Sequence, residues 1–127
     1  MLAILLVTSC DTPELNEKPD DFSWEIKMII SEDHRKGGIS QEIYPLTFDT
    51  QEKKAQLQLD VNVCFVDYEI NGKFIQFEDL YCTRICCDSK YAEDFAAYFF
   101  GEIFEWKIGA TDLELSRDGV KLYFRKL

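Results

Sequence analysis

Alternation of hydrophobic and polar residues is the dominant pattern of the chain, and it predicts strands with one buried face. In the segment Phe22–Ile30, the residues Phe22, Trp24, Ile26 and Met28 share one face. Gln56–Cys64 alternates without a break and continues into Phe65–Ile70, with Leu57, Leu59, Val61 and Val63 on one face and Gln58, Asp60, Asn62 and Cys64 on the other. Further strands are expected at Ile43–Phe48, Lys73–Phe77 with Phe74 and Phe77 as the inward candidates, Leu80–Cys86, Ile103–Ile108, Leu113–Leu115 and Val120–Arg125.

Turn residues separate these strands, and one segment switches to helical spacing. Asn71-Gly72 is a strong hairpin signal, because both residues tolerate a positive φ. Asp88 or Ser89 can cap a helix, which Gly101 would end and whose buried stripe would be Ala92, Phe95, Ala96, Phe99 and Ile103. The pattern therefore predicts a mostly β (α+β) domain with roughly eight strands and one packed helix.

Composition narrows the class of protein. The chain has 127 residues, which fits one domain, and 46% of them are hydrophobic, which is enough to form a core. Its formal net charge is −10. An acidic surface of this kind disfavours nucleic acid as a partner and disfavours docking by charge onto anionic lipid.

The N-terminus carries a separate pattern. Met1–Val7 is apolar and far shorter than the ~20 residues of a transmembrane helix. With Thr8, Ser9 and Cys10 it resembles a bacterial lipoprotein signal, although no Lys or Arg precedes the apolar run. The resemblance implies a signal peptide over residues 1–9 and lipid attachment at Cys10. The alternative is a buried N-terminal strand with a core cysteine.

Residues 10–21 are rich in proline and acidic side chains and predict a tether rather than a packed element. Acidic residues directly after the lipidated cysteine resemble the export signal of Bacteroidota surface lipoproteins. The resemblance implies an outer-membrane lipoprotein of the cell envelope. It does not decide between the periplasmic face and the cell-surface face of that membrane. The membrane would then be a partner through the lipid anchor.

Residues 22–127 resemble the META domain (HslJ-like) family, which is common in bacterial envelope lipoproteins. The matching segments are Trp24, Asn62-Val63-Cys64, Tyr68–Gly72, Ile75-Gln76-Phe77, Thr83–Cys86, Phe95–Phe100, Leu113-Glu114-Leu115 and Val120–Phe124. The resemblance implies a compact antiparallel β barrel-like domain with one packed helix. It marks Asn62, Tyr68, Thr83 and Cys86 as family-motif residues and implies no catalytic residue and no cofactor.

Four cysteines remain if Cys10 carries lipid, and an oxidising envelope favours pairing them. We expect a bridge from Cys64 to Cys86 or to Cys82, and we discount the adjacent pair Cys86–Cys87 as strained. Four reduced thiols are the alternative. Cys82, Cys86, Cys87 and His34 lack the spacing of a structural zinc site, so we expect no metal.

Two classes of function follow from these residues. The first is a lipid-anchored, non-enzymatic envelope protein that binds or supports another envelope protein or a small ligand. The second is a thiol-based redox protein or sensor that uses the cluster of Cys82, Cys86 and Cys87, because a thiolate is favoured near a helix N-terminus.

Overall fold

A computed structural model of the chain describes residues 17–32 and 38–127. The elements are a 3-10 turn η2 (Pro19–Asp21), nine strands and one α-helix, α2 (Lys90–Ala97). The strands are β1 (Trp24–Ser31), β2 (Gly38–Ile39), β3 (Pro45–Asp49), β4 (Lys54–Gln58), β5 (Val63–Asn71), β6 (Phe74–Cys82), β7 (Ile103–Ile108), β8 (Asp112–Arg117) and β9 (Val120–Lys126).

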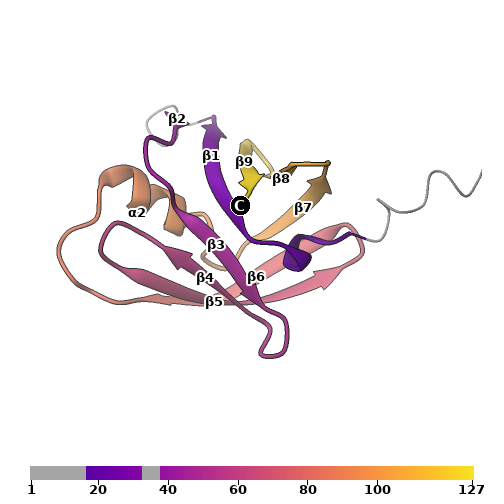
Figure 1. The fold of residues 1–127 in the computed structure, drawn as a ribbon, viewed down its shortest axis with the longest axis horizontal. Helices are drawn as coiled ribbons and strands as arrows, with labels where there is room; N and C mark the ends of the chain where they lie inside the picture. The colour runs from indigo at the N-terminus through magenta and orange to yellow at the C-terminus, as the bar shows by residue number, and fades with distance from the viewer. Residues whose placement is uncertain (1–16, 33–37) are drawn as a thin grey trace, which may run out of the picture.

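Eight of the strands form a closed antiparallel barrel in which neighbours in space follow the order of the chain, β1-β3-β4-β5-β6-β7-β8-β9. The barrel closes because β9 pairs with β1 from Trp24 opposite Lys126 to Ser31 opposite Val120. On its other side β1 pairs with β3 at Trp24 and Glu25 and with the short extra strand β2 at Met28 and Ile29 (Figure 1). The predicted fold class, a mostly β barrel-like domain with one packed helix, is confirmed.

Helix α2 closes one end of the barrel with aromatic side chains. Phe95 and Phe99 lie edge to face with ring centroids 5.3 Å apart, and Phe99 meets Phe77 of β6 at 4.7 Å. Phe95 also approaches Phe124 of β9 at 6.1 Å. All four rings are fully buried. The space inside the strands is therefore filled by packed aromatic and aliphatic side chains.

Turn η2 covers the barrel on the other side of the molecule from α2 (Figure 1). The indole N–H of Trp24 donates to the carbonyl of Pro19 at 2.8 Å, and the hydroxyl of Tyr68 donates to Asp20 at 2.8 Å. The ammonium of Lys126 lies 3.7 Å from the centroid of the Phe22 ring. These contacts fix the N-terminal entry of the chain against β1, β5 and β9. Residues 19–21, which were predicted to belong to the tether, therefore pack on the barrel, because Trp24 and Tyr68 bind them.

The long strand predicted from Gln56 onward is in fact two strands, β4 and β5, joined by a tight connection at residues 59–62. The backbone N–H of Leu59 donates to the carbonyl of Asn62 at 2.8 Å and closes this connection. Cys64 therefore faces the core beside Leu57, and Val61 is 42% exposed. The prediction was wrong here because strict alternation runs on through the turn and hides it.

Three individual orientations also differ from the prediction. A β-bulge between Ile26 and Met28 shifts the register of β1, so that Ile29 is buried in place of Met28. Phe74 is 52% exposed, because the inward residues of β6 are Ile75 and Phe77. Ile103 lies at the start of β7 rather than on the helix and is 50% exposed.

The local signals for the hairpin and the helix cap are confirmed. Asn71 pairs with Phe74 across the β5–β6 turn, and Gly72 has a φ of 58°. Ser89 accepts a hydrogen bond from the backbone N–H of Ala92 at the start of α2. The helix itself ends at Ala97, with Tyr98 as its C-cap, so the predicted stop at Gly101 is wrong; Gly101 has a φ of 67° in the turn that leads to β7. The positions of Gly72 and Ser89 need the residue types that the sequence supplies.

Candidate functional site

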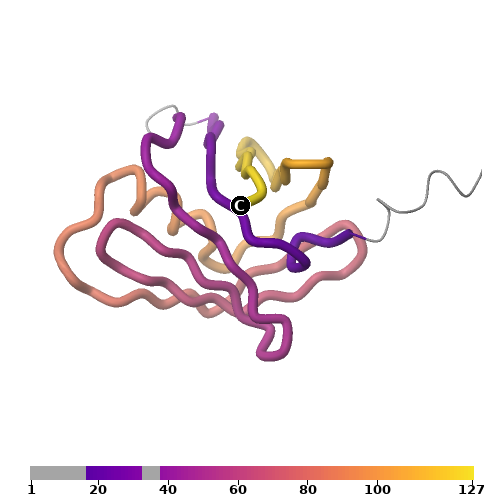
Figure 2. Tube along the Cα trace, viewed as in Figure 1, coloured from indigo at the N-terminus to yellow at the C-terminus, as the bar shows by residue number. Residues whose placement is uncertain are grey.

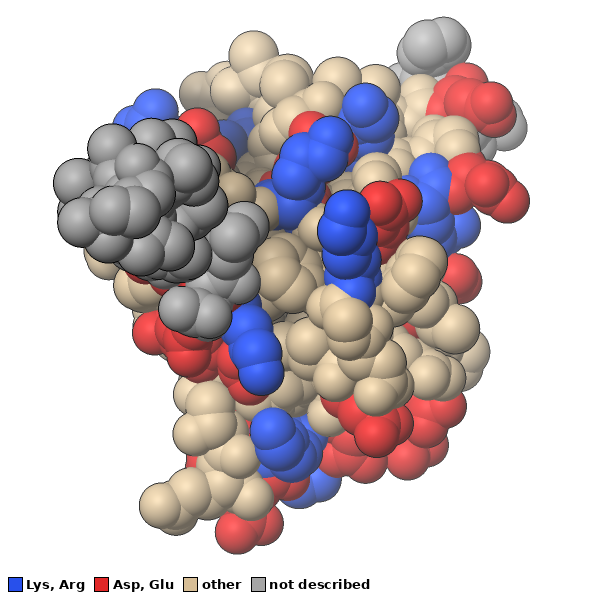
Figure 3. All heavy atoms as spheres, turned by 90° about the vertical axis from the view of Figure 1, so that its right-hand side faces the viewer, with Lys and Arg blue, Asp and Glu red and all other residues tan. Residues whose placement is uncertain are grey.

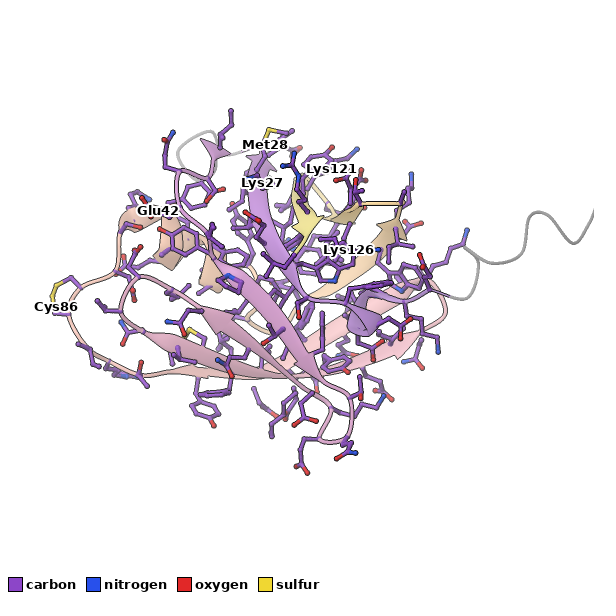
Figure 4. The ribbon with its side chains drawn as sticks, in the orientation of Figure 1. Lys27, Met28, Glu42, Cys86, Lys121 and Lys126 are labelled. Carbon is purple, nitrogen blue, oxygen red and sulfur yellow. A yellow bond between two sulfur atoms is a disulfide. The ribbon has the colours of Figure 1, made fainter. Side chains whose placement is uncertain are left out.

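The cysteine loop, residues 83–89, connects the end of β6 to the start of α2 and forms one extremity of the chain trace (Figure 2). Six of its seven residues are exposed and Asp88 is half-buried. Cys86 lies on its outer rim and points away from the barrel (Figure 4). The loop holds three candidate residues from the sequence, Thr83, Cys86 and Cys87, and a fourth, Asn62, lies beneath it.

The Asn62 side chain holds the loop through four hydrogen bonds. Its Nδ2 donates to the carbonyl of Ile85 at 2.7 Å and to Oδ2 of Asp88 at 2.5 Å. Its Oδ1 accepts from the Thr83 hydroxyl at 2.7 Å and from the backbone N–H of Ile85 at 2.7 Å. Asn62 is only 7% exposed, so this amide is a satisfied buried polar group whose role is to position the loop.

Two aspartates, Asp60 and Asp88, also hold the loop. We call these two residues, Asn62 and their hydrogen bonds the brace. Oδ1 of Asp88 accepts from the backbone N–H groups of Val61 at 2.8 Å and Asn62 at 3.3 Å. Burial raises the pKa of the Asp88 carboxyl, but these hydrogen bonds outweigh it and the net pKa lies below the usual range. The Ser89 backbone N–H, which donates to Asp60 at 2.8 Å, lowers the pKa of Asp60 in the same way.

Tyr44 joins this brace from the loop before β3. Its hydroxyl donates to Asp60 at 2.8 Å and lies 3.3 Å from the Ser89 hydroxyl. Burial is the main cause that raises the pKa of Tyr44. The sequence reasoning missed Tyr44 and Asp60. The available signal was Asp60-Val61-Asn62, since Asp and Asn are typical turn residues whose side chains bond backbone N–H groups.

Cys64 is bridged to Cys82, the second of the two predicted partners. The two residues face each other in the β5–β6 register, with Cα atoms 4.0 Å apart. The neighbouring backbone bond from Thr83 N–H to the Val63 carbonyl shows that Cys64 and Cys82 form a non-hydrogen-bonded pair, where facing side chains are closest. Cys86 is too far along the loop to take this place, so the Cys64–Cys86 alternative is wrong.

Cys86 is paired instead with Cys87, the pairing that the sequence reasoning discounted. With Cys64 and Cys82 joined, Cys87 is the only other cysteine in the described part of the chain. Both residues are exposed on the loop. The expected cluster of Cys82, Cys86 and Cys87 is therefore divided between a cross-strand bridge and an exposed pair.

The remaining site residues lie elsewhere. Tyr68 faces the barrel from β5, packs edge to face on Phe48 with ring centroids 4.9 Å apart, and donates to Asp20. Burial and the neighbouring Asp20 raise the pKa of Tyr68. Tyr68 takes no part in the brace of the cysteine loop. Cys10 and His34 lie outside the described residues.

The brace is built to hold the loop, and its groups have little capacity left for chemistry. The polar side-chain atoms of Asp60, Asn62 and Asp88 are engaged in hydrogen bonds within the loop and to the residues beneath it. Within residues 17–32 and 38–127 there is no group of three His, Cys, Asp or Glu side chains that could hold a metal ion. Of the exposed loop residues, Thr83 and Ser89 use their side chains in the brace, whereas Arg84, Ile85 and the paired Cys86 and Cys87 do not.

No helix in the described part of the chain is long and apolar enough to cross a membrane. No family model matches the chain, and no curated protein matches it. A solved structure described as an NMR structure of a protein from Burkholderia xenovorans matches with a TM-score of 0.64 and 20% sequence identity, covering 85% of this chain and 83% of that chain. This similarity shows a shared fold. The resemblance to the META domain family remains a prediction.

Proposed function

We propose that the protein is a lipid-anchored protein of the bacterial cell envelope, with a META-like barrel that binds or supports another component through its outer surface. The anchor follows from the Leu6–Cys10 motif and the acidic tether after it. The role of the barrel follows from the way in which it is filled and braced.

The observation that carries the binding role is the filled interior together with the braced loop. Trp24, Phe77, Phe99 and Phe104 occupy the inside of the barrel with no exposed surface, which leaves no room for a ligand there. The cysteine loop, in contrast, is exposed and fixed by at least eight hydrogen bonds to residues 60–63, with Tyr44 against Ser89 in addition. A surface loop held this rigidly loses little conformational entropy on binding a partner.

The anchor is tested by replacing Cys10 with alanine in the producing bacterium. We expect the wild-type protein to incorporate labelled palmitate and to fractionate with membranes, and the Cys10→Ala protein to do neither. The matched control is the double variant Cys86→Ala/Cys87→Ala, which loses thiols but keeps the anchor residue. Unchanged membrane fractionation of the Cys10→Ala protein would refute the anchor.

A thiol-based redox role is a second candidate, favoured by the exposure of Cys86 and Cys87. Reduction of this pair by a partner dithiol would convert one disulfide into two thiols and give the partner a disulfide in exchange, a transfer of two electrons and two protons. Alkylation of the folded protein after mild reduction, followed by peptide mapping, tests it. Labels at Cys86 and Cys87 alone favour the role, whereas an unreactive pair excludes it.

A further inference from the structure

A second surface feature lies on the side where the chain enters the barrel. It is a pocket of about 470 Å³ lined by Glu17, Lys18, Gly72, Lys73, Glu105, Trp106, Lys107 and Ile108. Three parts of the chain build it: the entry segment before η2, the β5–β6 hairpin turn and strand β7. We call it the Trp106 pocket. It contains none of the residues that brace the cysteine loop.

The backbone fixes the apolar wall of this pocket. The backbone N–H of Trp106 donates to the carbonyl of Lys73 at 2.9 Å, which ties β7 to the hairpin turn. Trp106 and Ile108 alternate along β7 with the exposed residues Glu105 and Lys107. The indole Nε1 of Trp106 is buried and has no hydrogen-bond partner in the described part of the chain.

The pocket also gathers unpaired positive charge on an acidic protein. Within the described ranges, Lys18, Lys73 and Lys107 have no carboxylate at salt-bridge distance, whereas Lys54 is paired with Asp67 and Lys90 with Asp94. Glu17 and Glu105 line the same pocket, so its lining carries one net positive charge against −10 for the whole chain. On this side of the molecule Lys and Arg side chains gather near the middle and many acidic ones lie toward the rim (Figure 3).

We propose that the Trp106 pocket binds an amphiphilic anion, an alkyl chain that ends in a phosphate or carboxylate group. The alkyl part would pack on Trp106 and Ile108, and the anionic head would lie among Lys18, Lys73 and Lys107. Neither feature alone defines this ligand: an inorganic anion leaves the apolar wall uncovered, and a neutral amphiphile leaves the lysines without a partner. This inference goes beyond the proposed function, because it names a ligand class and a site.

Such a ligand has two sources, a free amphiphile and the headgroup region of a membrane lipid. The membrane is within reach if Cys10 is lipidated, since Cys10 precedes Glu17 by seven residues, which span at most about 25 Å when extended. Both sources present the same chemistry to the pocket. The experiment therefore first tests the chemistry with a soluble probe and then separates the sources.

The probe is octyl phosphate, compared with octyl glucoside and with inorganic phosphate. The protein is the full chain carrying Cys10→Ser, so that the result does not depend on the anchor. Binding is measured by calorimetry and by the change in tryptophan fluorescence. We expect octyl phosphate to bind clearly more tightly than either control, and Lys73→Gln/Lys107→Gln to weaken it about tenfold or more, as expected for charge-assisted contacts.

The matched control is Lys27→Gln/Lys121→Gln, which makes the same change of charge at two lysines paired with Glu25 and Glu114. It is expected to leave the affinity for octyl phosphate unchanged. The proposal is overturned if octyl phosphate does not bind, if octyl glucoside binds equally well, or if both double variants behave like the parent. Circular dichroism checks that each variant is folded.

Vesicles separate the two sources. The same Cys10→Ser chain is sedimented with vesicles of phosphatidylglycerol and of phosphatidylcholine. Binding to phosphatidylglycerol that is lost in Lys73→Gln/Lys107→Gln identifies the lipid headgroup as the ligand. Binding of octyl phosphate without binding to vesicles identifies a free amphiphile. Both outcomes support the pocket, and neither depends on whether the native protein is lipidated.

Discussion

Replacing Asn62 by alanine is expected to release the cysteine loop from the barrel. The change removes four hydrogen bonds of 2.5–2.7 Å and leaves the backbone N–H and C=O of Ile85 without their partners. A net contribution of about 1 kcal/mol for each bond gives about 2–4 kcal/mol in the free energy of unfolding, because water can solvate part of the exposed loop. This loss lowers the urea midpoint by about 1–2 M.

Two measurements separate the local effect from the global one. Urea unfolding followed by tryptophan fluorescence gives the change in stability. Limited digestion with trypsin reports the loop itself, because Arg84 is exposed and directly precedes Ile85. We expect cleavage after Arg84 to be much faster in Asn62→Ala than in the wild type at urea concentrations where both are folded.

The control and the reverse test use chemically similar changes. Gln76→Ala removes an exposed amide whose Nε2 bonds only Glu78 on the outer face of β6, and it is expected to cost less than about 0.5 kcal/mol. Asn62→Asp places a second carboxylate against Asp88, so its deficit relative to the wild type is expected to shrink as the pH falls. A cost below about 1 kcal/mol for Asn62→Ala, or an unchanged rate of cleavage after Arg84, would refute the proposed role of the amide.

Three further predictions concern the Cys64–Cys82 bridge, the buried Phe99 ring and the loss of stability at acidic pH. Cys82→Ala is expected to lower the free energy of unfolding by about 3 kcal/mol, given a sequence separation of 18 from Cys64. In the wild type, cleavage after Arg84 should yield two fragments that separate on a non-reducing gel. A Cys64–Cys86 bridge would instead hold the two fragments together. Phe99→Ala is expected to cost about 3–5 kcal/mol, because it removes the buried ring that packs between Phe95 of α2 and Phe77 of β6, and an unfolding curve like that of the wild type would contradict this. Asp60 and Asp88 have lowered pKa values in the folded state. The stabilisation by these ionised carboxylates is therefore present above the unfolded pKa of about 4 and is lost as the pH falls through the folded pKa values. As the pH falls through this range, the stability of Asp88→Asn is expected to approach that of the wild type, and a constant difference would contradict this.

Local signals predicted the helix and the hairpin, because each depends on a few neighbouring residues, whereas the barrel was expected only from the resemblance to the META domain family. Ser89 and Gly72 fill positions that demand their residue types. The connection at residues 59–62 was not predictable from periodicity, since its polar residues fall in phase with the alternation around it. The bulge in β1 was hidden for a related reason: Ile29 and Met28 are both hydrophobic, and only pairing with β9 decides which one is buried.

The candidate site was predicted in part. Asn62, Thr83 and Cys86 were marked by the family resemblance, and the structure brings Asn62 and Thr83 into direct contact below the loop that carries Cys86. Tyr44 was not marked, because it meets Asp60 and Ser89 across long separations in the chain that no local pattern reveals. Asp60 carried a local turn signal, but its contact with Ser89 is equally distant in sequence. Whether Cys82 or Cys86 is the disulfide partner of Cys64 likewise depended on the β5–β6 register.

The pairing of the first barrel strand with the last one has a consequence for the order of events in biosynthesis. A chain that emerges with its N-terminus first leaves one edge of β1 unpaired until Lys126, the partner of Trp24, has appeared. The β5–β6 hairpin is complete much earlier, because its partners are close in sequence. We expect Cys64 and Cys82 to be joined while the barrel is still open, so that oxidation precedes closure and burial of Cys64 seals the bridge afterwards.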